Sequence, residues 1–391
     1  IMKKICFEKA KRKIDTDWRI VKKQNNILNK KMKKSILVVS ICVLSLLTTN
    51  AQQKTKKQPN VFLITLDGVR WQDVFTGIDT VLLNSPYAHD RELLTKKFVG
   101  NSPEENRTLL MPFFWNTIAK KGQLHGNRNN DSEVNLTNKM AFSYPGYNEI
   151  LTGKADDENV NSNDKLYNKN VTILEKANNS KACKGKVAAF CSWDVFPYII
   201  NDKRSGVPVN AGYMDAKGNL NQTEAFLNEI QRQAPIIWEG VRLDVFTHHF
   251  AKEYVKKNHP KLVYISYGET DDFAHGGFFD FYTKSMHNTD ALIEDLWNYV
   301  QNDPFYKNNT YFIITTDHGR GIGTQEVSKW TDHGSDVKGA DQTWIAVLGP
   351  QVQATGEGKN EQLYTNQIAA TVLKLLGLEN TDATMGKSLT L

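Results

Sequence analysis

The chain has 391 residues, of which 24% are charged and 40% hydrophobic, and its formal net charge at pH 7 is +6. This length is ample for one large domain with a substantial core. The first 34 residues hold 13 basic and 3 acidic side chains, a net of +10, so the remainder carries −4. A mildly acidic body gives no electrostatic basis for binding a nucleic-acid duplex.

Residues 32–51 have the order of a secretory signal peptide. Met32-Lys33-Lys34 is charged, Ile36 to Leu47 is apolar, and small or polar residues follow up to Ala51. We therefore predict cleavage after Ala51 and an exported protein, periplasmic or secreted. The alternative is a membrane anchor, but the apolar run is shorter than the ~20 residues that a membrane span requires.

This leader divides the chain into four parts. We expect an upstream segment outside the fold (1–31), the signal peptide (32–51), a linker (52–59) and one catalytic domain (60–391). Contact with a membrane is then expected only through an uncleaved leader.

The body keeps two cysteines, Cys183 and Cys191. An exported protein could join them in a disulfide, but we favour two separate buried thiols.

Apolar, β-branched runs predict the strands of a mostly parallel α/β sheet. They are Asn60–Leu66, Lys186–Ser192, Lys261–Gly268, Thr310–Thr316 and, as the last clear strand, Gln342–Leu348. Helical spacing predicts helices at Met111–Lys121, Val171–Lys176, Trp193–Ile200, twice within Gln222–Pro260, at Phe279–Asn302 and at Tyr364–Leu376. Val69–Phe75 is expected to be a loop, and His248 and His249 to be structural.

Acidic residues stand where three of these strands end. Asp67-Gly68 follows the first, Glu269 to His275 a later one, and Asp317-His318-Gly319 another. In open α/β sheets, functional residues gather at the carboxyl ends of strands. Asp271 and His275 are four residues apart, so one helical turn directs both toward one cation.

Each strand end also has a simpler interpretation. Asp67-Gly68 could be a hairpin turn, the acids near Asp271 could lie in an exposed loop, and Asp317-His318 could merely form hydrogen bonds. Asp272 competes with Asp271 as a ligand, and Glu269 is a weaker rival. A further His-Gly pair, His333-Gly334, lies in the irregular segment that follows.

Ser143 stands two residues before Pro145, which can open a helix. A serine at this point is commonly an N-cap. A helix N-terminus also offers unpaired N–H groups and a positive dipole end, which suit a serine that attacks phosphate. Both interpretations stay open on the sequence.

Taken together and in order, these motifs resemble the alkaline phosphatase superfamily, and most nearly its nucleotide pyrophosphatase/phosphodiesterase branch. The resemblance spans Asn60 to Leu376. It implies a three-layer α/β/α sandwich and two divalent ions, expected to be Zn²⁺. By this resemblance one ion is held by Asp67, Asp317, His318 and Ser143, and the other by Asp271, His275 and His333.

The same resemblance implies a hydrolase of small phosphate esters that acts through a phosphoseryl intermediate, on diesters or pyrophosphates slightly ahead of monoesters. Donors for the non-bridging oxygens are expected among Asn159 to Asn170, or at Asn127, Asn129 and Asn130. Sulfatases of the superfamily carry Arg where this chain has Tyr147, which weighs against sulfate esters. A metal-stabilised binding protein without catalysis is the alternative that is not an enzyme.

Overall fold

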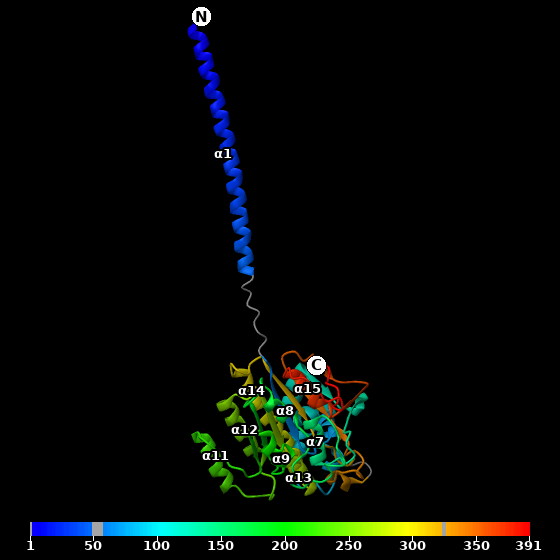
Figure 1. Ribbon diagram of the computed structural model, residues 1–391. Helices are drawn as coiled ribbons and strands as arrows, with labels where there is room; N and C mark the ends of the chain where they lie inside the picture. The colour runs from blue at the N-terminus through cyan, green and yellow to red at the C-terminus, as the bar shows by residue number, and fades with distance from the viewer. Residues whose placement is uncertain (1, 49–57, 323–325) are drawn as a thin grey trace. The chain divides into compact units, whose positions relative to one another are not determined.

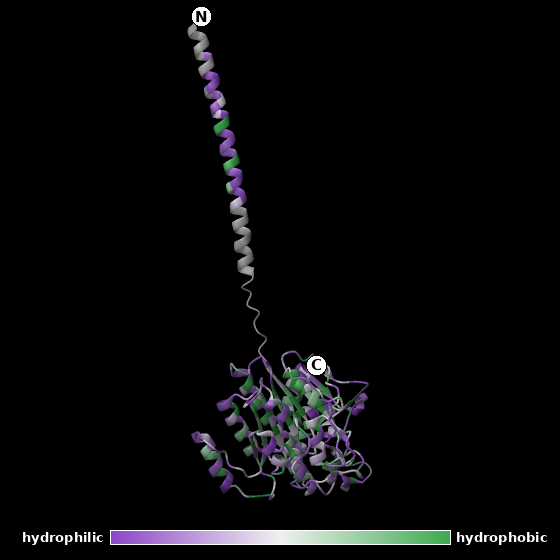
Figure 2. Ribbon diagram, in the orientation of Figure 1, coloured by the Kyte–Doolittle hydropathy of each residue, from purple (hydrophilic) through white to green (hydrophobic). Residues whose placement is uncertain are grey.

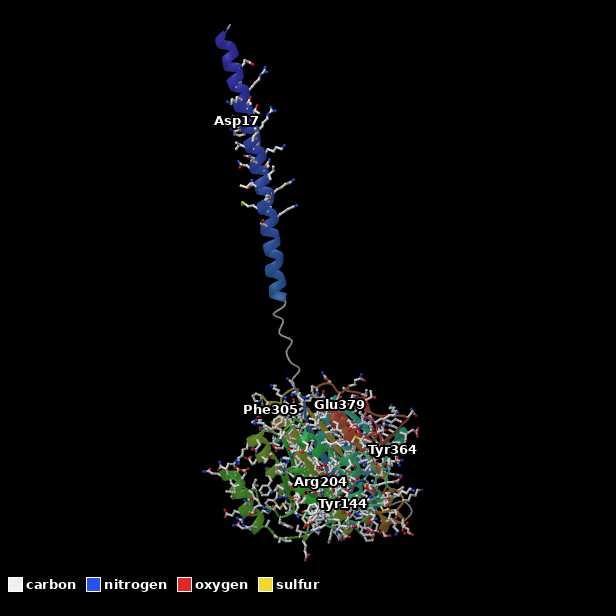
Figure 3. All side chains as sticks on the ribbon, viewed as in Figure 1. Asp17, Tyr144, Arg204, Phe305, Tyr364 and Glu379 are labelled. Atoms are coloured by element: carbon white, nitrogen blue, oxygen red, sulfur yellow. The ribbon has the colours of Figure 1, made fainter. Side chains whose placement is uncertain are left out.

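The computed structural model describes residues 2–48, 58–322 and 326–391. The chain divides into two units, residues 1–57 and 58–391. In the first unit, helix α1 (Met2–Thr48) runs through both the upstream segment and most of the expected signal peptide, and exposed side chains such as Asp17 project from it (Figure 3). No described helix combines the length and apolarity that a membrane span needs. The predicted cleavage point after Ala51 lies outside the described residues.

The second unit is built on an eight-stranded sheet in the order β10-β2-β9-β7-β1-β6-β4-β5. The neighbours from β7 to β5 are parallel, whereas β9 is antiparallel to both β7 and β2. The strands are β1 (Asn60–Leu66), β2 (Gln123–His125), β4 (Val187–Cys191), β5 (Val209–Ala211), β6 (Leu262–Tyr267), β7 (Thr310–Thr315), β9 (Ile345–Leu348) and β10 (Gly356–Glu357). A small second sheet joins β11 (Glu361–Tyr364), β3 (Ser132–Asn135) and β8 (Gln342–Thr343).

Helices cover both faces of the large sheet. Along β1, Phe62 and Ile64 belong to one hydrophobic core, whereas Val61 and Leu63 belong to another. Helices α12 and α14 pack against the first core, and α7, α8 and α15 against the second (Figure 1). Hydrophobic residues gather in the interior between these layers (Figure 2). The fold is therefore an α/β sandwich with a mostly parallel central sheet, as predicted.

The helices vary widely in length. Those around the sheet are α7 (Ser143–Thr152), α8 (Ile173–Asn179), α9 (Phe196–Ile199), α10 (Asp202–Ser205), α11 (Gln222–Gln233), α12 (Asp244–Asn258), α13 (Glu269–His275), α14 (Phe279–Asn302) and α15 (Gln367–Leu375). Between β1 and β2 lie α2 (Trp71–Thr76), α3 (Thr80–Leu83), α4 (Arg91–Phe98), α5 (Pro103–Leu110), the π-helix η1 (Phe114–Ile118) and α6 (Ala119–Lys121). Short 3₁₀ turns are η2 (Arg128–Asn130) and η3 (Val327–Thr331).

Four sequence predictions about the elements need correction. The run Gln342–Leu348 is two strands, because Trp344 is buried and its indole donates to the Val69 carbonyl (3.0 Å), which separates β8 from β9. It is also not the last strand, because β10 and β11 follow. Part of the expected loop Val69–Phe75 is helix α2, whose Val74 and Phe75 pack into the core.

The helix expected at Trp193–Ile200 begins only at Phe196. Trp193 instead forms an isolated antiparallel bridge with Val241, which holds it in an extended conformation. The two cysteines, Cys183 and Cys191, are free and buried, as we favoured.

Candidate metal centre

The central strands bring the predicted site residues to one edge of the sheet. Strand β1 lies between β6 and β7 and is parallel to both, so the carboxyl ends of the three strands are neighbours. Asp67 follows β1, Asp317 lies just past β7, and α13, which carries Asp271, begins after β6. Three distant acidic motifs therefore meet because of the strand order.

Asp67, Asp317 and His318 form a first ligand group. Nε2 of His318 lies 3.3 Å from Oδ1 of Asp67 and 3.4 Å from Oδ2 of Asp317. All three side chains are buried, and their candidate ligand atoms lie within 4.8 Å of one another. The hydroxyl of Ser143 is 3.4 Å from the same Nε2. The first ligand group and Ser143 are thus the four residues that the resemblance assigns to one ion.

The hydrogen bond of the other ring nitrogen decides how His318 can act. Its Nδ1 lies 2.9 Å from the carbonyl oxygen of Gly319, which can only accept a hydrogen bond. Nδ1 therefore carries the proton, and in the neutral ring the lone pair of Nε2 faces the two carboxylates. A second hydrogen bond of this kind fixes the orientation of metal-binding histidines.

Asp271, His275 and His333 form a second ligand group. Oδ2 of Asp271 is 3.2 Å from Nε2 of His275, one helical turn later on α13. The Nε2 atoms of His275 and His333 are 2.9 Å apart, and Nε2 of His333 is 3.7 Å from Oδ1 of Asp271. The structure therefore brings His333, from the segment after η3, to the pair on α13.

The two ligand groups adjoin each other through His318. Nε2 of His318 is 3.9 Å from Oδ1 of Asp271. The rings of His318 and His333 have their centroids 4.0 Å apart. All seven sequence-predicted residues are thus gathered at one place, and two ligand groups this close suit a pair of ions that share one substrate group.

Ser143 is the first residue of α7, and its side chain does not cap that helix. The N-cap residue is Phe142, which makes no side-chain cap bond. Close packing brings this helix end to the first ligand group, because a Cβ at Gly146 would overlap the carbonyl oxygen of Asp317. The N-cap interpretation of Ser143 is therefore wrong, and its hydroxyl faces the ligands instead.

Burial and charge perturb the acids of the first ligand group. Burial, and next the nearby charge of Asp271, raise the pKa of Asp67 well above its usual range. Burial and the charge of Asp67 raise the pKa of Asp317 in the same direction. Without a cation these carboxylates repel each other, so the protein alone favours their protonation.

Asp271 and His333 of the second ligand group have lowered pKa values. Burial alone would raise the pKa of Asp271, but the guanidinium of Arg320, and next His333, hold it well below its usual range. Burial lowers the pKa of His333 to about 2, so this imidazole is neutral at pH 7 and free to act as a ligand.

The residues present fit a pair of divalent metal ions. Oδ1 of Asp67, Oδ2 of Asp317 and Nδ1 of His333 are buried and have no hydrogen-bond partner among the described residues. Buried polar atoms without partners are costly, and here the two carboxylate oxygens converge on one imidazole nitrogen. Carboxylate oxygens and imidazole nitrogens are the donors that such ions prefer in proteins.

Arg320 is a site residue that sequence reasoning missed. It is buried, and its guanidinium pairs with Oδ1 of Asp271. Its other N–H groups donate to the carbonyl oxygens of Trp330 (2.9 Å) and Thr331, just before His333. An arginine directly after Asp-His-Gly was the only signal, and it did not reveal which residues the side chain would join.

We expect Arg320→Met to weaken the second ligand group. The change removes the cation that orients Asp271 and the donors that hold the segment leading to His333. Loss of such supporting contacts typically costs about 10- to 100-fold in metal affinity. Metal titration followed by calorimetry should therefore show one weakened site and one unchanged site. Equal weakening of both sites, or of neither, would contradict this role.

Tyr147 and Glu269 also support the site. The hydroxyl of Tyr147 donates to Oδ2 of Asp67 at 2.7 Å and so fixes that carboxylate. Glu269 is not a ligand candidate, because it accepts from the backbone N–H of Asp244 (2.7 Å) and from the Ser285 hydroxyl (2.9 Å). Asp272 lines the site cavity, but no described contact joins it to His275 as Asp271 is joined.

The two sets of asparagines that were candidate phosphate donors differ in whether they reach the site cavity. Asn163 lines the site cavity, which has a volume of about 230 Å³, and its Oδ1 accepts from the backbone N–H of Tyr144 (3.0 Å). Its amide N–H groups are thereby left for a ligand. In contrast, Asn127 and Asn130 donate to Glu357, and Asn129 lies beside them in η2. The choice between the two asparagine groups thus favours the first.

Removal of metal should make stability depend on pH in a defined direction. The raised pKa values of Asp67 and Asp317 mean that the folded, metal-free protein binds more protons than the unfolded chain above about pH 4. Stability then falls as pH rises from there. We expect a lower melting temperature at pH 8 than at pH 5 in chelator, and a smaller drop in Asp67→Asn. A rise from pH 5 to pH 8 in chelator would contradict the assignment.

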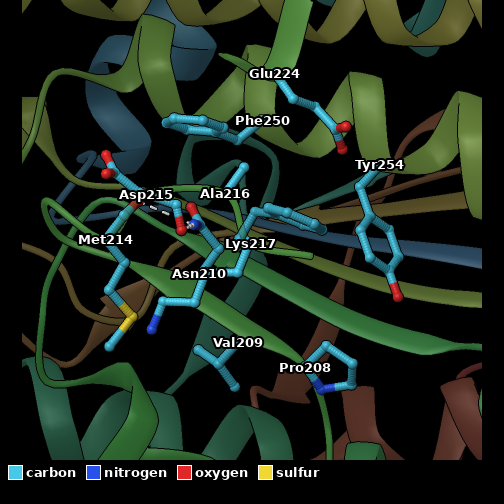
Figure 4. Close-up of a pocket in the computed structure, with 11 residues that line it drawn as sticks. Pro208, Val209, Asn210, Met214, Asp215, Ala216, Lys217, Glu224, Phe250 and Tyr254 are labelled. Atoms are coloured by element: carbon cyan, nitrogen blue, oxygen red, sulfur yellow. Dashed lines mark hydrogen bonds between the residues drawn. The ribbon is translucent and has the colours of Figure 1, made fainter. Parts of the chain in front are cut away.

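A second cavity, of about 270 Å³, lies beside the edge strand β5 (Figure 4). Phe250 and Tyr254 reach it from α12, and Val209 and Met214 come from β5 and the turn after it. None of the candidate ligands lines it. This cavity is separate from the candidate metal centre.

The fold and the grouped ligands define an α/β protein with a mostly parallel central sheet and a candidate divalent metal centre. Residues 140–378, more than half of the chain, match the profile of the Sulfatase family. The chain therefore belongs to the Sulfatase family. No curated protein sequence matches it.

Several solved structures share the fold at low sequence identity. Alkaline phosphatase PafA superposes with a TM-score of 0.54 at 11% identity, over 85% of this chain and 98% of that one. The lipoteichoic acid synthase LtaP from Listeria monocytogenes gives 0.52 at 12%, over 85% and 75%. The phosphonate monoester hydrolase SpPMH from Silicibacter pomeroyi gives 0.51 at 12%, over 85% and 76%. These likenesses do not single out the phosphodiesterase branch.

Proposed function

We propose that the protein is an exported, zinc-dependent phosphoric ester hydrolase that cleaves diesters in preference to monoesters. The observation that carries the proposal is the position of Ser143, whose hydroxyl lies beside the first ligand group at the start of α7. A nucleophile beside a pair of ligand groups is the arrangement that phosphoryl transfer requires. The resemblance to nucleotide pyrophosphatases/phosphodiesterases supports the same reading.

In the reaction, Oγ of Ser143 forms a bond to phosphorus as the bond between phosphorus and the leaving oxygen breaks. The serine proton goes to solvent, and a phosphoseryl ester results. Ions held by the two ligand groups would lower the pKa of the hydroxyl and offset the charge on the departing oxygen. The amide of Asn163 donates to a non-bridging oxygen. Water then cleaves the phosphoseryl ester and restores Ser143.

The charge of the cavity supports a preference for diesters. Its lining includes the carboxylates of Asp67, Asp271 and Asp272 and neither lysine nor arginine. Ions held by the two ligand groups would offset the charges of Asp67 and Asp271, but neither lysine nor arginine is present to bind the second negative charge of a monoester dianion, which carries about twice the charge of a diester. A small, singly charged ester is therefore the substrate that this cavity fits best.

Sulfate esters are the second candidate, favoured by the family profile that matches the chain. A sulfate ester also carries a single negative charge, so the cavity would accept it. Against it stands Tyr147, where the resemblance to sulfatases requires an arginine. Its hydroxyl is committed to Asp67 (2.7 Å) and offers no positive charge.

The two candidates are separated by turnover of matched aryl esters. Purified protein would be assayed with bis-(4-nitrophenyl) phosphate, 4-nitrophenyl phosphate and 4-nitrophenyl sulfate, with zinc and after chelation. We expect the diester to be cleaved fastest and chelation to abolish turnover. Faster turnover of the sulfate, with conversion of Ser143 detected by peptide mass spectrometry, would replace the proposal. No turnover of any ester by the zinc-loaded protein would favour a binding protein.

A further inference from the structure

The cavity of the metal centre has a charged side and an apolar side. The ligands and Asp272 form the charged side. Trp193, Val241 and Gly268 form the apolar side. An apolar surface facing a catalytic centre binds the part of a substrate that does not react. The identity of that part can therefore be sought in the residues around Trp193.

The apolar side is fixed before any ligand binds. Trp193 and Val241 are joined by an antiparallel bridge, beside which the backbone N–H of Asp194 donates to the Gly240 carbonyl at 2.8 Å. A Cβ at Gly268 would lie only 3.1 Å from Cγ1 of Val241, so the chain after β6 packs tightly against it. A preformed surface binds a ligand without the entropic cost of ordering loops.

Two exposed isoleucines precede Val241 in the chain. Ile236 and Ile237 are 66% and 53% exposed, an unusual pair for neighbouring aliphatic side chains. The hydroxyl of Tyr213 donates to the carbonyl oxygens of Trp238 (2.8 Å) and Val241 (2.9 Å), which anchors the segment. The two isoleucines are therefore presented by an ordered stretch.

A row of aromatic rings joins Trp238 to α13 and α14. The ring of Trp238 lies 4.7 Å from that of Phe273, which follows the cavity residue Asp272. Phe273 stacks on Phe281 at 5.1 Å, and Phe281 contacts Phe278 at 6.1 Å. Phe281 and Phe278 are 50% and 44% exposed. Exposed apolar surface next to a catalytic cavity marks a binding site.

We propose that Trp193 and Val241 bind the organic group of the ester, and that Ile236, Ile237 and Phe281 bind the part of that group that extends beyond the cavity. The inference rests on the proposed function and adds the substrate class, an ester of an uncharged, apolar alcohol. Asp272 is the one carboxylate of the lining that is not a candidate ligand, and the lining has no cationic side chain to bind a polyanionic alcohol, so such alcohols are disfavoured. An aryl or alkyl group gains from burial along this surface.

The test varies only the organic group at a constant leaving group. Methyl, phenyl and hexyl diesters of 4-nitrophenyl phosphate would be compared in the zinc-loaded full chain. Wild type should prefer phenyl and hexyl over methyl by about tenfold in kcat/KM, as expected for partial burial of such groups. Trp193→Ala should reduce both preferences to within about twofold, whereas Trp193→Phe should keep the phenyl preference.

A second variant separates the cavity from the outer surface. The double change Ile236→Ser and Ile237→Ser should lower the hexyl preference and leave the phenyl preference unchanged. Tyr254→Ala, which removes a ring from the separate cavity beside α12, is the matched control and should alter neither. Equal values of kcat/KM for all three diesters in wild type would overturn the inference.

Binding of uncleaved analogues keeps this inference distinct from the proposed function. Calorimetry with hexyl(methyl)phosphinate and dimethylphosphinate, which carry one negative charge and have only P–C bonds to their organic groups, should give about tenfold tighter binding of the first. This result without any ester turnover would support the binding surface and reject the hydrolase. Turnover that depends on zinc, without any preference between the analogues, would support the hydrolase and reject the binding surface.

Discussion

Replacing Ser143 with alanine is expected to lower kcat for diester hydrolysis by about 10⁴-fold or more, the scale seen when a covalent nucleophile is removed. The hydroxyl lies 3.4 Å from Nε2 of His318, and no other serine or threonine lines the described cavity. Metal content should stay near two ions, because six other ligand side chains remain. Steady-state kinetics and metal analysis of the same preparation measure both quantities.

Two variants act as controls for this result. Ser143→Thr keeps a hydroxyl at the same position and should retain part of the activity. Ser335→Ala changes an exposed serine near His333 and should have no effect. If Ser143→Ala keeps more than a tenth of the wild-type kcat, water rather than serine is the nucleophile and the phosphoseryl intermediate is excluded.

Replacing Asp317 with asparagine should lower activity, and its effect on stability should change sign when the metal is removed. Asp317 is fully buried, and one of its oxygens has no partner among the described residues. Asparagine has nearly the same volume but lacks the charge, so we expect one ion to be lost and kcat/KM to fall by at least about a hundredfold. The melting temperature in zinc should fall below that of wild type.

In chelator the order of stabilities should reverse. Burial and the charge of Asp67 raise the pKa of Asp317, which means that its ionised form destabilises the metal-free fold. Asp317→Asn removes this repulsion and should melt above wild type at pH 8. Asp332→Asn, at an exposed position, is the matched control. Lower stability of Asp317→Asn in both conditions would indicate a purely structural carboxylate.

The long strands were predictable because they are buried on both faces. A strand buried on both faces appears in the sequence as a continuous apolar run, not as alternating apolar and polar residues. Asn60–Leu66 is such a run, and the structure gives β1 the same bounds. Strands such as β5 and β10 have only three and two residues, and no pattern of this length is distinctive. Their pairing depends on neighbours that are distant in sequence.

Gathering of the candidate ligands could be predicted for a related reason. Asp67 and Asp317 directly follow readable strands, and strand ends in a parallel sheet share one edge. Arg320 could not be placed, because its partners lie on α13 and after η3 and only the folded chain brings them together. Trp193 was assigned to a helix, since its bridge to Val241 leaves no trace in either local sequence.

The order β7-β1-β6 also dictates when the metal centre can assemble during folding. These three strands are adjacent in space but come from residues 60–66, 262–267 and 310–315, so no early part of the chain contains a complete ligand group. Pairing across such separations is slow, and the ions can bind only after it. A divalent ion bound at this centre should therefore stabilise only the folded state. It should slow unfolding and leave the rate of refolding nearly unchanged.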